Sequence, residues 1–341
     1  RSKNIWGPYE EKMVLADGTA THQGALVQTD TGEWWTMLFR DNGAVGRTPY
    51  LLPVAWTDGW PVIGTNGKAG DKYPKPSTAT PSRRTPLPAT DVFRHYKLAP
   101  QWGWNHNADK SKWSLTERAG YMRLYTASVT DNPYQARNTL TQRILSYRPS
   151  TPSYGTAAID ITHMADGDIC GVGVFQDPIA FIGVKKDGNT TSVVYRSSSL
   201  TGKTTTSELT GEQINAETVY LRAVADFETS KARFYYSTDN VQFKQFGPEF
   251  KMEYDLSVFT GNKFAIFNYA TKNLGGYVDI DWFSTEPEFT EDTYFDPVFE
   301  GYSKESLTVS HLELDTDEDP RTLLTGDSRS LTVYAVYMDG H

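Results

Sequence analysis

Carboxylates at two places in this 341-residue sequence have the chemistry of a general acid and a general base. Glu10 and Glu11 are adjacent near the first residue. An acid-rich run that follows the segment YVDIDWF contains Glu286, Glu288, Glu291 and Asp292. Neighbouring carboxylates on a turn or a tail face different directions and stay solvated. We therefore expect neither group to form a catalytic pair.

Several other kinds of chemistry are excluded. The sequence has no glycine-rich phosphate-binding loop and no Ser-His-Asp string in a motif context, which excludes nucleotide binding and serine hydrolysis. The single cysteine, Cys170, excludes an internal disulfide, a Cys-rich zinc site and a redox pair. A net charge of −9 opposes phosphate contacts, so nucleic acid is not an expected partner. No run approaches the roughly 20 apolar residues of a membrane helix.

A second set of candidate residues is aromatic and polar. Trp102, Trp104, His106 and Asn107 crowd into one segment, a mixture that could line the rim of a sugar cleft, because flat rings stack on sugar faces. The chain contains 9 Trp, 20 Tyr and 16 Phe, so these rings could equally fill β-sheet cores. The same two alternatives apply to the polar residues of segment 136–143 (ARNTLTQR), which we expect to lie on a strand.

Short strands and turns are expected to position these residues. Residues 23–63 predict a β-meander, with turns at Asp30-Thr31-Gly32 and Asp41-Asn42-Gly43, because Asn, Asp and Gly tolerate the positive φ of tight turns. From residue 91 to about 286 strand patterns recur every 8–12 residues, which favours a large two-sheet sandwich. The segment SELTGEQINAE, residues 207–217, is the one helical candidate.

The segments between and after these strands have a different composition. Residues 68–90 are rich in Pro, Lys, Ser and Thr and predict a linker between domains. Residues 287–341 begin with an acidic stretch and continue with two or three further strands. At 341 residues, two domains and a remnant are the expected organisation.

The first 65 residues resemble the closing part of a glycoside hydrolase of family 43, the five-bladed β-propeller enzymes that act on xylan, arabinan and their side chains. The matching motifs are RSK, GPYE, HQGALV, TGEWW, GAVGR, LPV and DGWPVIG. Two later motifs, QWGWNHN and ARNTLTQR, look like the accessory C-terminal domain of the β-xylosidase and α-L-arabinofuranosidase branches. The tail 303–341 looks like the opening strands of a bacterial immunoglobulin-like domain.

This resemblance implies an all-β chain. Its parts would be the closing segment of a five-bladed β-propeller (1–67), a Pro-rich linker (68–90), a concanavalin-like β-sandwich (91–286), and an acidic linker with a partial immunoglobulin-like tail (287–341). It also implies that the chain is the C-terminal piece of a larger, secreted, periplasmic or cell-surface bacterial enzyme. The start of the chain has no apolar run that could act as a signal.

The resemblance also implies site residues. His22 of the HQG motif would lie at the propeller centre near the sugar or a water-bound calcium, and Arg47 would hold sugar hydroxyls and steer the carboxylates. The two catalytic carboxylates and a third that tunes the acid would all lie upstream of Arg1. An inverting glycosidase needs its acid and base about 6.5–9.5 Å apart, and 65 residues amount to little more than one blade. Trp102 and Trp104 would be rim residues.

The remaining expectations concern ions and partners. Asp91 and Asp281, at the opening and closing strands of the sandwich, could bind a structural Ca²⁺, as related lectin-like sandwiches do, or serve as ordinary polar caps. No cofactor is expected for catalysis. The expected partners are plant cell-wall oligo- or polysaccharide and the N-terminal propeller fragment of the same enzyme, with no nucleic acid and no membrane insertion. The alternative is a non-catalytic carbohydrate-binding or structural sandwich.

Overall fold

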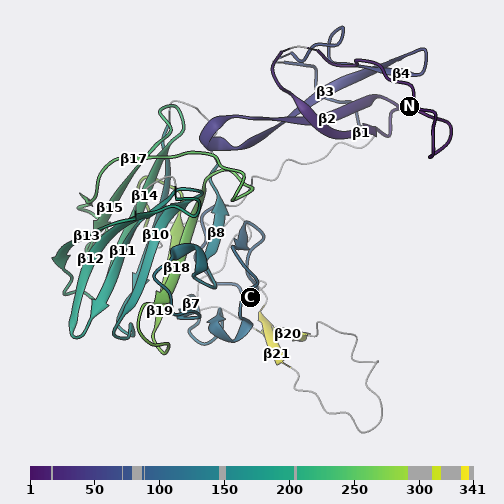
Figure 1. The fold of residues 1–341 in the computed structure, drawn as a ribbon. Helices are drawn as coiled ribbons and strands as arrows, with labels where there is room; N and C mark the ends of the chain where they lie inside the picture. Colours follow the sequence, from purple (N-terminus) through teal and green to yellow (C-terminus); the bar gives the residue numbers. More distant parts are fainter. Residues whose placement is uncertain are drawn as a thin grey trace. The chain divides into compact units, whose positions relative to one another are not determined.

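The computed structural model is almost entirely β-structure and consists of two compact units (Figure 1). The first unit comprises Arg1–Pro86 with Phe259–Gly261, and the second comprises Leu87–Val258 with Asn262–His341. Residues 1–16, 18–70, 72–78, 87, 89–145, 151–202 and 206–290 are described in full, and 309–315 and 332–337 as backbone. Within these residues no helix has the length and apolar character needed to cross a membrane.

The first unit is a four-stranded antiparallel sheet in the order of the chain, as the predicted meander requires. Its elements are β1 (His22–Gln28), β2 (Trp34–Asp41), the 3-10 turn η1 (Gly43–Val45), β3 (Arg47–Thr57) and β4 (Trp60–Ile63). The β3–β4 turn consists of Asp58 and Gly59, both with positive φ, at 52° and 71°. This is the conformation that Asp-Gly hairpin turns favour.

The two faces of this sheet differ in their burial. One face forms a core of Leu38, Leu52, Val54 and Ile63, against which Val14, Leu15, Ala69 and Tyr73 pack from outside the sheet. The other face leaves apolar side chains exposed on three adjacent strands, with Val27 at 54%, Met37 at 52% and Leu51 at 40% exposure. We call Val27, Met37 and Leu51 the open face.

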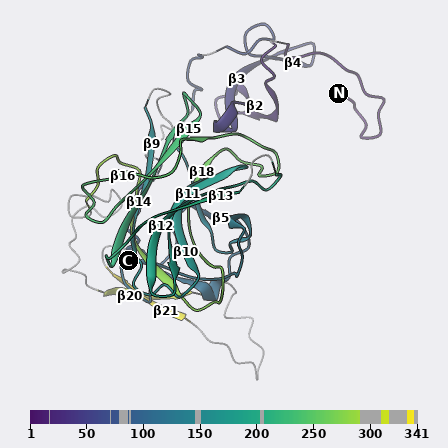
Figure 2. The ribbon, with the colours of Figure 1, turned by 60° about the vertical axis from the view of Figure 1, so that its left-hand side comes forward.

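The second unit is a sandwich of two antiparallel sheets (Figures 1 and 2). Seven strands form one sheet in the order β13-β12-β11-β10-β18-β8-β5. Their bounds are β5 Trp102–Trp104, β8 Leu140–Arg143, β10 Asp168–Phe175, β11 Ile179–Asp187, β12 Thr190–Ser198, β13 Ser207–Gln213 and β18 Lys263–Ala270.

The other sheet has the order β16-β15-β14-β9-β19-β7-β6, with β17 beside β15. Its strands are β6 Trp113–Ser114, β7 Met122–Tyr125, β9 Ser153–Asp160, β14 Thr218–Asp226, β15 Lys231–Ser237, β16 Lys244–Gln245, β17 Phe250–Lys251 and β19 Tyr277–Ser284. Two 3-10 turns, η2 (Lys110–Lys112) and η3 (Pro133–Gln135), interrupt the connections.

The core lies between the sheets, and a second apolar layer covers the outside of the seven-stranded sheet. The sheets approach so closely that a Cβ at Gly155 of β9 would lie 2.7 Å from the ring of Phe264 on β18. On the outer side Tyr134 of η3 packs in a cluster with Phe175 and Phe267, and its hydroxyl donates to the Gln176 carbonyl at 2.7 Å. Strands β10 and β18 are therefore buried on both faces.

The structure bears on the helix predicted in the sandwich and on the strands predicted in the tail. The predicted helix at 207–217 is wrong, because residues 207–213 form the edge strand β13, paired with β12. In the tail, β20 (Val309–Asp315) and β21 (Thr332–Tyr337) form an antiparallel pair. The rest of the predicted immunoglobulin-like tail, with Glu291 of the acidic run, lies outside the described residues.

Asp168, the first residue of β10, predicts a pH dependence of stability. Its side chain is buried, Oδ2 accepts a hydrogen bond from the Ala165 amide at 2.8 Å, and Oδ1 has no partner among the described residues. Burial raises the pKa of this carboxyl to about 6. The folded state therefore holds the proton more tightly than the unfolded state. The resulting stability is fully present below the unfolded-state pKa, near 3.9, and is lost as the pH rises through 6.

We expect Asp168→Asn, which carries no charge at any pH, to gain stability relative to wild type as the pH rises from about 4 to about 7, with no further gain above that. The pKa difference corresponds to at most about 3 kcal/mol. Urea unfolding of both proteins at several pH values measures this. Comparing the two proteins cancels the titration of all other groups. A stability difference that does not change with pH would contradict the prediction.

Candidate functional site

One end of the four-stranded sheet brings His22, Phe39 and Arg47 together. His22 on β1 is the register partner of Phe39 on β2, and their ring centroids are 4.7 Å apart. Arg47, the first residue of β3, is the register partner of Asp41 and places its guanidinium 4.3 Å from the centre of the Phe39 ring. The two residues that the sequence predicted to bind sugar therefore contact the same aromatic ring.

A β-bulge sets the position of His22. The register shifts between His22 and Gly24, and Gln23 between them has a φ of 47°. Only glycine fits at position 24, since a Cβ there would lie 1.8 Å from the Met37 carbonyl oxygen. The Nδ1 atom of His22 lies 2.5 Å from the Ala20 carbonyl, which leaves Nε2 without a partner among the described residues. The HQG motif thus presents an exposed imidazole at the strand end.

Arg47 is held by one carboxylate and two rings. Its Nε lies 3.4 Å from Oδ1 of Asp41, and the guanidinium stacks on Phe39 and, at 4.1 Å, on Phe259 of the same unit. Asp41 is the one carboxylate within salt-bridge distance of Arg47 among the described residues. This arrangement can donate hydrogen bonds to hydroxyl groups, but it does not supply the two carboxylates that acid–base hydrolysis of a glycosidic bond requires.

Trp102 and Asp91 form a buried hydrogen-bonded pair inside the sandwich. The Trp102 indole N–H donates to Asp91 Oδ2 at 2.8 Å, and the ring stacks on Phe93 and meets Phe283 edge-on. Oδ1 of Asp91 accepts from the Phe93 amide at 2.8 Å. Trp102 is only 7% exposed, so it packs in the core and offers no ring face to a sugar.

Trp104 and its neighbours lie in a segment tied to the loop around η3. Trp104 is half-buried and packs against Trp113, with ring centroids 5.2 Å apart. His106 Nε2 lies 2.5 Å from the Tyr134 carbonyl, and the carbonyl of Asn107 accepts from Arg137 at 3.0 Å. These contacts hold the segment after β5 against the segment around η3. A rim position for Trp104 stays a prediction.

Calcium binding by Asp91 and Asp281 stays a prediction. Asp91 has both carboxylate oxygens occupied by N–H donors, and Asp281 is the bulge residue of β19, between Ile280 and Trp282. The described residues contain no group of three or more His, Cys, Asp or Glu side chains that could hold a metal. Because Ca²⁺ takes six to eight oxygen ligands, the structure favours the polar-cap alternative for Asp91.

Sequence reasoning missed Phe39, the ring that joins the two candidate residues. Its segment WWTMLFRD predicted a strand, but nothing in the alternation distinguishes Phe39 from Trp35 or Met37 on the same face. The signal lies in the register, because His22 and Arg47 lie across from the same end of β2.

Comparisons with known proteins agree with this architecture. The sequence profile of the β-xylosidase C-terminal concanavalin A-like domain matches residues 90–286. A β-xylosidase of Formosa agariphila is 32% identical over 321 residues, which cover 83% of this chain and 52% of that protein. A non-reducing end α-L-arabinofuranosidase of Bacteroides ovatus is 35% identical over 147 residues, 38% of this chain and 27% of that protein. The predicted concanavalin-like sandwich is therefore confirmed.

Solved structures are similar over most of this chain. A bifunctional GH43-CE protein of Bacteroides eggerthii has a TM-score of 0.73 at 39% identity, covering 85% of this chain and 37% of that chain. A GH43 glycoside hydrolase engineered for both endo-xylanase and exo-arabinofuranosidase activity has a TM-score of 0.74 at 34% identity, with coverage of 83% and 59%. The chain spans about half the length of the curated relatives it matches.

Proposed function

This chain belongs to the family of β-xylosidase C-terminal concanavalin A-like domains of glycoside hydrolase family 43, and we propose that it is the C-terminal part of an inverting, exo-acting enzyme of that family. The enzyme removes α-L-arabinofuranosyl or β-D-xylosyl units from plant cell-wall polysaccharide. Its polymeric substrate places it outside the cytoplasm of a bacterium. Support comes from the relatives, which include proteins named as β-xylosidases and an α-L-arabinofuranosidase.

The observation that carries the proposal is the end of the sheet at His22, Phe39 and Arg47. An imidazole ring and a planar guanidinium contact one aromatic ring at the same end of the sheet, which brings two groups that can donate hydrogen bonds to sugar hydroxyls close together. The acid and base carboxylates come from the N-terminal propeller part of the same enzyme, upstream of Arg1. In this proposal His22 and Arg47 bind substrate and do not exchange protons with it.

The open face supports a neighbouring propeller blade as partner. Val27, Met37 and Leu51 extend across three adjacent strands, and β1 is an edge strand whose residues are all exposed. An unpaired edge and an exposed apolar surface on one sheet are features that proteins normally cover. A propeller packs the next blade against such a face and leaves only short, protected edges.

We expect residues 1–341 alone to show no hydrolysis of aryl β-xylosides or aryl α-L-arabinofuranosides, and to gain activity when mixed with the N-terminal propeller part. Size-exclusion chromatography and release of the aryl group measure complex formation and turnover.

Met37→Asp should weaken the complex, because it buries a charge in the interface. Val241→Asp, at a sandwich position that is 79% exposed, is the matched control. Turnover by the chain alone, with contamination excluded by mass spectrometry, would contradict the proposal. A mixture that forms no complex and does not hydrolyse the aryl glycosides would also contradict it.

A further inference from the structure

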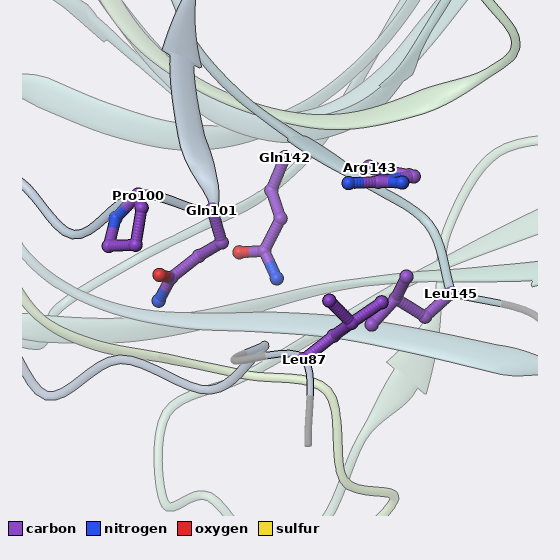
Figure 3. A pocket seen from close by; sticks show the side chains of 6 residues that line it. All are labelled: Leu87, Pro100, Gln101, Gln142, Arg143 and Leu145. Atoms are coloured by element: carbon purple, nitrogen blue, oxygen red, sulfur yellow. The ribbon is translucent and has the colours of Figure 1, made fainter. Parts of the chain in front are cut away.

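A pocket of about 190 Å³ lies at the β5 and β8 edge of the sandwich (Figure 3). Its walls come from the residues that precede β5, from the end of β8 and from the segment that enters the sandwich. They combine apolar side chains with two amides and one guanidinium. The lining residues are Leu87, Pro100, Gln101, Gln142, Arg143 and Leu145.

The buried amide of Gln142 requires a hydrogen-bond donor. The Gln142 side chain is 2% exposed, and its Nε2 donates to the Ala89 carbonyl at 2.7 Å, which fixes the orientation of the amide. Its Oε1 and the Oε1 of Gln101 both lack a hydrogen-bond partner among the described residues. A buried carbonyl oxygen without a donor is costly. Two such oxygens lining one pocket (Figure 3) suit a ligand with neighbouring hydroxyl groups.

The charges at the pocket add a requirement for an anion. Arg143 forms no ion pair with any described residue and has Lys263 as its direct register partner on β18. Burial, followed by repulsion from Arg143, lowers the pKa of Lys263. Arg143 and Lys263 are therefore adjacent cations without a carboxylate partner among the described residues. A bound carboxylate could accept two parallel hydrogen bonds from the planar guanidinium of Arg143.

We propose that this pocket binds a single sugar residue that carries a carboxylate, a uronic acid. The sugar hydroxyls donate to Gln101 and Gln142, the carboxylate accepts from Arg143, and the apolar ring face packs on Leu87 and Pro100. This site is separate from the one at His22 and Arg47. Uronic acid binding here involves none of the residues proposed for catalysis, so it can be tested independently of the proposed function.

The test is a calorimetric or NMR titration of the full chain with D-glucuronate, D-xylose and acetate. We expect D-glucuronate to bind with a dissociation constant on the order of 1 mM, as for a small ligand with few contacts. D-Xylose and acetate should each bind at least about tenfold more weakly, because each lacks one of the two recognised groups. In the NMR titration, the side-chain amide signals of Gln101 and Gln142 should shift with D-glucuronate.

Arg143→Ala should weaken D-glucuronate binding about tenfold or more, since it removes a charge-assisted hydrogen bond. Arg143 is exposed, so the variant is expected to fold, and its melting temperature verifies this. Arg233→Ala is the matched control, because Arg233 is a half-exposed arginine on a strand that forms an ion pair with Glu249. No measurable D-glucuronate binding, equal binding of D-xylose or acetate, or an unchanged dissociation constant in Arg143→Ala would each overturn the proposal.

Discussion

Replacing Asp279 by alanine is expected to lower the free energy of unfolding of the sandwich by about 3–5 kcal/mol. Asp279 is 1% exposed and accepts two hydrogen bonds from its cross-strand partner Arg123, at 2.7 and 2.9 Å. A third comes from Arg118 at 3.1 Å. Hydrogen bonding to Asp279 raises the pKa of Arg123 above its usual value. Without Asp279, Arg123 keeps only the exposed Glu117 as a salt-bridge partner among the described residues.

Urea unfolding monitored by tryptophan fluorescence measures this loss. Asp187→Ala is the matched control, because Asp187 also pairs with a cation, Lys272, but is 74% exposed; we expect less than about 1 kcal/mol there. A double variant, Asp279→Leu with Arg123→Met, should be less destabilised than Asp279→Ala, since removing both charges leaves neither unpaired. A loss below about 1 kcal/mol in Asp279→Ala would show that water reaches the arginines and compensates them.

The strands of both units were predictable because their signals are local. Gly32 and Gly43 of the two predicted turns both have positive φ, and the period-2 alternation of YVDIDWF matches β19. Continuous apolar runs such as ICGVGVF also gave strands. The sequence could not show that β10 is buried on both faces, because the covering residue Tyr134 lies about 40 residues earlier in the chain.

The wrong helix at 207–217 has a physical cause. Glu, Leu and Gln favour helix in isolation, yet residues 207–213 form the edge strand of a sheet, where β12 offers backbone partners along most of its length. Leu209 faces Tyr195 across that pair, and Glu208 reaches Lys185 at 2.8 Å. Pairing with a preformed neighbour outweighs a weak local preference.

Long-range pairing also explains what sequence reasoning missed at the sites. Asp91 and Trp102 suggested a cation ligand and a sugar platform when considered separately. Their 2.8 Å hydrogen bond makes them one buried structural pair. Likewise, the Gln142 amide is fixed by the carbonyl of Ala89, 53 residues away. Residue type indicated the possible chemistry at these positions, but only the three-dimensional contacts show which groups remain without a partner.

In the complete enzyme, Arg47→Ala is expected to lower kcat/KM by about 10²-fold while leaving the fold intact. Each charge-assisted hydrogen bond from the guanidinium to a sugar hydroxyl contributes about 1.5–3 kcal/mol, and every 1.4 kcal/mol is a factor of ten in rate. Steady-state kinetics on an aryl glycoside, together with the melting temperature, measure the two effects separately. Among the described residues Arg47 forms an ion pair only with the half-exposed Asp41, so the cost in stability should be small.

Two further variants separate sugar binding from a structural role of Arg47. Arg47→Lys should stay much nearer to alanine than to wild type, because a single ammonium cannot reproduce the planar fork that bonds two hydroxyls. Arg40→Ala is the matched control: Arg40 also stacks on a ring, Tyr50 at 4.4 Å, but lies one residue from Phe39 and Asp41 on β2 and so points to the other face of the sheet. It should keep wild-type kcat/KM. If Arg47→Ala keeps the wild-type kcat/KM and only lowers the melting temperature, Arg47 has a structural role in the sheet, and the sugar must bind elsewhere.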